Sequence, residues 1–73
     1  MKAYYVEFRL TENGDVLGIG LLARNKVDAY TTAVYEKIPE LYGHSPYVAW
    51  VKSVTYASGK CKTFDVPYEG CNV

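Results

Sequence analysis

The sequence predicts a single α+β domain with the element order ββαββ, in which one helix packs on one face of a four-stranded antiparallel sheet. Three observations lead to this fold class: alternation of apolar and polar residues near the N-terminus, an apolar stripe at helical spacing, and a later segment rich in β-branched and aromatic residues. A chain of 73 residues can build one small hydrophobic core and no second one. Residues 1–73 are therefore expected to form one globular domain.

Residues 3–10 and 16–23 are predicted to pair as a β-hairpin. The first segment has apolar residues at every second position, and these are expected to face the core: Tyr4, Val6, Phe8 and Leu10. The second segment follows the same period, with an inward set of Leu17, Ile19, Leu21 and Ala23. Between them, the Asn13-Gly14 pair tolerates the positive φ angles of a tight hairpin turn.

A helix is predicted to follow, with Asn25 as its N-cap and Asp28 in its first turn. Its core-facing stripe consists of Val27, Tyr30, Val34, Ile38 and Leu41. Pro39 has no amide hydrogen, so the regular helix is expected to end near Ile38. A looser turn then reaches Tyr42 and stops at Gly43.

Two further strands are predicted at residues 48–57 and 60–66. Alternation in the first is imperfect, because Val51 falls on the face opposite Trp50 and Val54. A β-bulge and burial on both faces would each explain this pattern, and both stay open. Phe64 and Val66 are the expected inward pair of the last strand, and Pro67 is expected to end it. A right-handed crossover of the helix then gives the strand order 2-1-3-4.

Composition narrows the classes of partner. Eight Lys and Arg residues balance eight Asp and Glu residues, and a net charge of zero removes most of the attraction that drives non-specific binding to nucleic acid. Nucleic acid is therefore disfavoured as a partner. The sequence contains neither the apolar core of a signal peptide nor an apolar run of about 18 residues. We expect a cytoplasmic protein that does not associate with membranes.

No motif for catalysis, cofactor binding or metal binding is found, so the chain is not expected to be an enzyme. The potential metal ligands Cys61, Cys71 and His44 lack the paired spacing of zinc sites, and the two cysteines are expected to be free thiols. His44 has the sequence context of a polar loop residue. An enzyme that uses Cys61 or His44 is the least favoured hypothesis. The Gly18-Ile19-Gly20 step lies inside a predicted strand, whereas phosphate loops open a helix.

The predicted partner-binding surface is the sheet face opposite the helix. It should carry Tyr5, Glu7, Arg9, Val16 and Leu22 around a strip of glycines. Exposed aromatic and aliphatic side chains with charges beside them are typical of protein interfaces. Pairing of this face with a second copy of the chain, or ordinary surface exposure, are the alternatives. The second-choice surface is the outer side of the helix, with Tyr35 and Glu36.

In size and layout the chain resembles the small single-domain proteins that phages and mobile elements carry to block host machinery, anti-CRISPR proteins among them. The resemblance covers the architecture alone and carries over no residues. It implies an inhibitor of a larger host complex. The function predicted is thus a non-enzymatic protein–protein interaction module. The alternative is a small nucleic-acid-binding domain that uses Lys52, Lys60 and Lys62 with neighbouring aromatic residues of the C-terminal hairpin.

Overall fold

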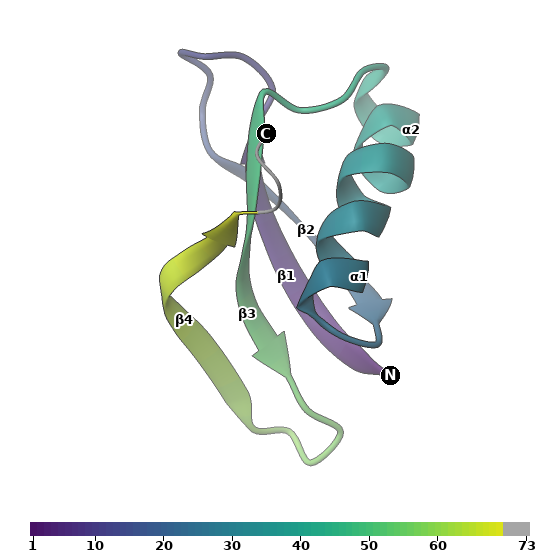
Figure 1. The fold of residues 1–73 in the computed structure, drawn as a ribbon, viewed down its shortest axis with the longest axis vertical. Helices are drawn as coiled ribbons and strands as arrows, with labels where there is room; N and C mark the ends of the chain where they lie inside the picture. Colours follow the sequence, from purple (N-terminus) through teal and green to yellow (C-terminus); the bar gives the residue numbers. More distant parts are fainter. Residues whose placement is uncertain (70–73) are drawn as a thin grey trace.

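The computed structural model describes the backbone of residues 1–69 and the side chains of residues 1–64, and it confirms the predicted fold class. Four antiparallel strands form one sheet in the order β2-β1-β3-β4: β1 (Lys2–Arg9), β2 (Leu17–Ala23), β3 (Val48–Thr55) and β4 (Cys61–Glu69). A continuous helical segment lies on one face of this sheet (Figure 1). It consists of α1 (Lys26–Thr32), a π-helical turn η1 (Ala33–Lys37) and α2 (Ile38–Tyr42).

Strand β1 lies in the middle of the sheet and supplies the centre of the core. It pairs antiparallel with β2 on one side and with β3 on the other. Its predicted inward residues Tyr4, Val6 and Phe8 are buried. The remaining predicted inward residues of this hairpin also lie on the core side: Ala23 is buried, and Leu10, Leu17, Ile19 and Leu21 are partly buried against the core. The period-2 pattern therefore assigned both faces of the hairpin correctly.

The connection between β1 and β2 differs from the expected tight turn. Among the described residues, positive φ angles occur at Gly43 and Gly59 and not at Asn13 or Gly14. Instead, the backbone N–H of Gly14 donates a hydrogen bond to the carbonyl of Thr11 at 3.1 Å, which closes a four-residue turn with glycine in its last position. The chain reversal is spread over residues 10–16, so no central residue needs a left-handed conformation.

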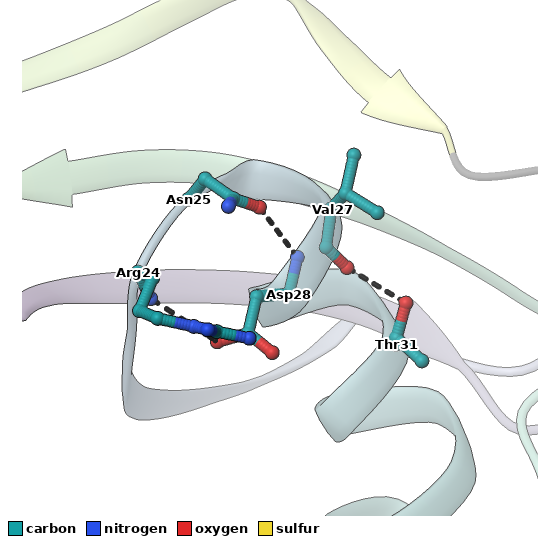
Figure 2. A network of polar contacts seen from close by, with 5 residues as sticks. All are labelled: Arg24, Asn25, Val27, Asp28 and Thr31. Carbon is teal, nitrogen blue, oxygen red and sulfur yellow. Dashed lines mark hydrogen bonds and ion pairs between the residues drawn. The ribbon is translucent and has the colours of Figure 1, made fainter.

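The predicted helix start is confirmed (Figure 2). The side-chain oxygen of Asn25 accepts a hydrogen bond from the backbone N–H of Asp28 at 2.8 Å. The Asp28 carboxylate in turn accepts the backbone N–H of Arg24 at 3.1 Å and lies 3.6 Å from the Nε of Arg24. A capping box would return this second bond to the N-cap residue itself, whereas here it reaches one residue further. Thr31 also donates to the carbonyl of Val27 at 2.7 Å.

The helix does not end near Ile38, as the sequence had predicted, but continues through Pro39 to Tyr42. The backbone N–H of Ile38 bonds to the carbonyl of Ala33, five residues back, as in a π-helix. In a regular α-helix the Pro39 ring would collide with the carbonyl four residues before it. A wider turn immediately before the proline relieves that collision. Gly43 ends the helix as predicted, at φ 88°.

Two members of the predicted helical stripe are exposed. Tyr30, Val34 and Ile38 are buried, but the other buried positions are the alanines Ala29 and Ala33. The stripe therefore centres on small residues and leaves Val27 outside it. Leu41 is 66% exposed, because the extra residue of the π-helical turn rotates the last turn of the helix. Tyr42, although 41% exposed, meets the ring of Phe8 edge-on, with ring centroids 5.5 Å apart.

Strand β3 contains a β-bulge, which was one of the two explanations for the imperfect alternation of its sequence. Tyr5 pairs with Ser53 and Val6 pairs with Val51, so Lys52 is an extra residue on the β3 side. The bulge shifts the alternation by one position. As a result Ala49, Val51 and Val54 all face the core, while Trp50 lies on the other face.

Strand β4 is longer than predicted and runs through Pro67 to Glu69. A proline is compatible with a strand at the edge of a sheet, where one side needs no hydrogen-bond donor. The pairing of β4 with β3 also changes register between Val51 and Ser53. Phe64 packs against the core as predicted. The side chain of Val66 lies outside the described residues.

We expect Asn25→Ala to lower the free energy of unfolding by about 1 kcal/mol, because the N–H of Asp28 loses its acceptor at the start of the helix. Urea unfolding followed by circular dichroism would measure the change. Asn25→Asp is the matched control, since it retains an acceptor of the same length. Equal stabilities of the Ala variant and the wild type would contradict the cap.

We expect Phe8→Ala to cost about 3 kcal/mol or more, because Phe8 is fully buried in the central strand and contacts Tyr42. The same unfolding experiment applies. Leu22→Ala is the control, because its side chain is mostly exposed on the same sheet and should change stability by well under 1 kcal/mol. A cost for Phe8→Ala as small as that of the control would show that Phe8 is not central to the core.

Candidate functional site

The helical segment covers one face of the sheet and leaves the other face uncovered (Figure 1). We call this uncovered side the open face. Strand β1 runs through its middle with Ala3, Tyr5, Glu7 and Arg9. The register gives the first three a neighbour on each side, and it gives Arg9 a neighbour on the β3 side. On the β2 side these neighbours are Leu22, Gly20 and Gly18; on the β3 side they are Thr55, Ser53, Trp50 and Val48.

Tyr5 is held over a glycine of the neighbouring strand. A Cβ atom built on Gly18 would overlap the hydroxyl and the ring of Tyr5, which shows that this ring lies directly above Gly18. Tyr5 is nevertheless 42% exposed. Part of the predicted glycine strip is thus filled by the chain's own aromatic ring, whereas Gly20 is exposed, with only the carbonyl oxygen of Tyr4 near its Cβ position at 3.9 Å.

Glu7 is held by the single tryptophan of the chain. The two residues pair directly across β1 and β3, and the indole N–H of Trp50 donates to a carboxylate oxygen of Glu7 at 3.0 Å. Both side chains are half-buried. A charged acceptor makes a stronger hydrogen bond than a neutral one, and partial burial limits competition from water. The bond therefore holds the indole ring against Glu7 on the open face.

The other predicted residues of this surface lie towards its margins. Leu22 is 66% exposed. Its cross-strand partner is Ala3, whose small side chain covers little of the leucine. Val16 is exposed but precedes β2, so it belongs to the connecting loop. Arg9 is exposed at the end of β1, where its carbonyl accepts the N–H of Tyr47 at 2.8 Å.

The second predicted surface is separate from the first. Tyr35 and Glu36 lie in the π-helical turn and are exposed. The helix stands on the core side of the sheet (Figure 1), so these two residues point away from the open face. The structure thus brings Tyr5, Glu7 and Leu22 together and does not join Tyr35 and Glu36 to them.

Five basic residues gather at one end of the molecule, although the net charge is zero. The N-terminus, the start of α1 and the turn between β3 and β4 meet at this end (Figure 1), as the pairings of Lys2 with Ala23 and of Thr55 with Cys61 require. We call it the basic end, and it consists of Lys2, Arg24, Lys26, Lys60 and Lys62. The Nζ atoms of Lys26 and Lys62 lie 4.7 and 5.9 Å from the centre of the Phe64 ring. Cation–π contacts of this kind occupy the ring and limit its use for stacking on a base.

His44 and Cys61 lie at opposite ends of strand β3. His44 Nδ1 is 2.8 Å from the carbonyl oxygen of its neighbour Ser45, in an exposed loop. Cys61 is an exposed free thiol. Cys71 lies outside the described residues, and the prediction that the two cysteines are not bridged falls there too. Within the described part of the chain there is no pocket and no group of three His, Cys, Asp or Glu side chains able to hold a metal ion.

No helix in residues 1–69 is long and apolar enough to cross a membrane.

Trp50 is the open-face residue that sequence reasoning missed. Alternation set it on one face with Val48 and Val54 and left open which face is buried, whereas the bulge at Lys52 reverses the phase of the strand midway. The out-of-phase Val51 was the available signal. It would have set Trp50 on the face opposite the core.

Comparisons with protein-family models, curated proteins and solved structures found no match to this chain.

We expect a double-mutant cycle between positions 5 and 18 to reveal strong coupling. Gly18→Ala forces the Tyr5 ring out of its place and should destabilise the domain by about 1 kcal/mol, whereas in the Tyr5→Ala background the same change should cost nothing. Gly20→Ala is the control: its Cβ has room, so it should be neutral or slightly stabilising. Additive effects at positions 5 and 18 would contradict the stacked arrangement.

Proposed function

We propose that this protein is a non-enzymatic interaction module whose open face binds a protein partner. The observation that carries this is a pair of aromatic side chains on the open face that are held in place by their own neighbours: the exposed Tyr5 over Gly18 and the half-buried Trp50 on Glu7. An aromatic ring that is already ordered loses little conformational freedom on binding. Tyrosine and tryptophan are also the side chains that most often dominate binding energy at protein interfaces.

The arrangement of the open face supports the same function. The two aromatic residues lie near its middle, and Leu22 and Val16 add exposed aliphatic surface at the β2 side. Arg9 supplies a charge at the margin. An apolar centre with polar or charged surroundings is the usual anatomy of a protein interface. Among the described residues, Glu7 is engaged by Trp50, so we assign it to positioning the indole rather than to direct recognition.

Within this function, we favour an inhibitor of a larger complex. A rigid domain of 73 residues presents a surface, and occupying a surface of a larger assembly is a direct way to block it. This role rests on the resemblance in size and layout to the small proteins of phages and mobile elements, anti-CRISPR proteins among them, and on no single residue. A small accessory subunit would use the same open face.

The alternative function is nucleic-acid binding, and the basic end is the observation that favours it. Lys60 and Lys62 from the C-terminal hairpin lie with Lys2 and Lys26 at one end, where phosphate groups would find several ammonium groups. Tyr56 is exposed in the same turn. Against stacking on bases, the ring of Phe64 already contacts two lysines. Lys52, the third predicted lysine, lies at the β3 bulge and is half-buried.

We expect the double variant Tyr5→Ala, Leu22→Ser to keep its fold by circular dichroism and to bind the partner at least about tenfold more weakly, a loss of about 1.4 kcal/mol. The measurement is quantitative mass spectrometry of the protein that co-purifies with the tagged wild type from the native host, followed by titration with that purified protein. Tyr35→Ala is the control, because it removes an exposed tyrosine ring from the helix, on a surface separate from the open face.

Two outcomes would contradict the open-face interface. In one, the double variant still binds while Tyr35→Ala does not, which would make the helix the binding element. In the other, binding falls steeply with added salt and is lost on Lys60→Ala, Lys62→Ala, which would favour nucleic acid because phosphate contacts release counterions.

A further inference from the structure

The two edges of the sheet are protected to different degrees. Strands β2 and β4 are the edge strands. The sequence of β4 contains Lys62 and Pro67, which are residues that hinder the addition of another strand. The sequence of β2 is Leu-Gly-Ile-Gly-Leu-Leu-Ala, with neither a charged residue nor a proline. An uncharged apolar edge strand of this kind readily pairs with a further strand.

The environment of β2 is also incomplete. Among the described residues, only β1 forms a ladder with it, so the backbone groups along its outer side have no partner strand. Its inward residues Leu17, Ile19 and Leu21 are half-buried, whereas Val6 and Phe8 of the neighbouring β1 are fully buried. At this edge, therefore, backbone groups lack a partner strand within the described chain and apolar side chains are only partly covered.

We propose that β2 pairs antiparallel with β2 of a second copy of this chain, with Gly20 opposite Gly20 at the twofold axis. The two sheets would then form one continuous sheet. A twofold contact of this type requires a strand that is complementary to itself. The sequence of β2 meets this requirement on both faces when it is reversed about Gly20.

On the core side, the register sets Ile19 of one copy opposite Leu21 of the other, so that two half-buried aliphatic residues cover each other. On the open face, it sets Leu22 opposite Gly18 of the second copy. There the exposed leucine side chain meets a residue without one, beside the Tyr5 ring that covers that glycine. On the open face a large residue thus lies opposite a small one, and on the core side two aliphatic residues pack against each other.

Charge is compatible with this pairing. The net charge of the chain is zero, so two copies do not repel each other as wholes. Asp15 precedes β2 and Arg24 follows it. Antiparallel pairing brings the end with Asp15 in one copy to the end with Arg24 in the other. Like charges do not meet at either end of the strand pair.

Gly20 lies on the open face opposite Tyr5, and its substitutions test the pairing in the purified chain alone, with no foreign protein present. The Cβ position of Gly20 is open, so a side chain fits in the single chain. Gly20→Asp would set two carboxylates directly opposite each other at the axis, which opposes pairing. Gly20→Asn has the same size and no charge. Tyr5 and Leu22 are unchanged in both variants, so a failure of the dimer is distinguishable from a failure of the open-face interface.

Sedimentation equilibrium over a wide concentration range should show a dimer for the wild type and for Gly20→Asn, and a dimer at least about tenfold weaker for Gly20→Asp. Circular dichroism checks that each variant is folded. Gly20→Lys should also weaken the dimer, and an equimolar mixture of the Asp and Lys variants should restore it as a heterodimer in native mass spectrometry. A monomeric wild type, or a Gly20→Asp dimer as strong as that of Gly20→Asn, would overturn the proposal.

Discussion

The fold depends on the double pairing of the central strand β1. Because β1 is paired on both sides, its alternate residues are forced to opposite faces of the sheet, with Tyr4, Val6 and Phe8 in the core and Tyr5 and Glu7 on the open face. A slip by one residue would exchange the two sets and expose the core residues. The same strand therefore supplies the centre of the core and the centre of the candidate surface, and the positions of the two are linked.

Two irregular elements, a π-helical turn and a β-bulge, keep the apolar side chains of the helix and of β3 on the core side of the sheet. The π-helical turn Ala33–Lys37 lets the helix continue through Pro39 and turns Tyr42 towards Phe8. The bulge at Lys52 returns Val54 to the core side after Val51 and leaves Trp50 opposite Glu7. Each adds one residue beyond the regular repeat, and each keeps apolar side chains on the core side. The bulge also shapes the candidate site, because without it the strand could not direct both Val54 inward and Trp50 outward.

The two glycines of β2 have different surroundings. Gly18 makes room for the Tyr5 ring and thereby orders an aromatic residue of the open face. Gly20 faces open space in the single chain and lies at the centre of the proposed strand pairing. Face and edge are distinct surfaces, so the chain can in principle use the open face for a foreign protein and the edge of β2 for a second copy. Leu22 borders both, and the two contacts would be coupled through it.

The sequence by itself determined the element order, the faces of the first hairpin, the N-cap at Asn25 and the stop at Gly43, because each rests on local periodicity or on the backbone preference of one residue. It also placed Tyr5, Glu7 and Leu22 on one face, since alternation within paired strands is local. Only the tertiary structure decided the course of the helix through Pro39, the length of β4 and the outward position of Trp50. In each case the packing or pairing of a whole element with its neighbours outweighed the local pattern of its residues. The contacts of Tyr5 with Gly18 and of Trp50 with Glu7 depend on strand register, which no local pattern encodes.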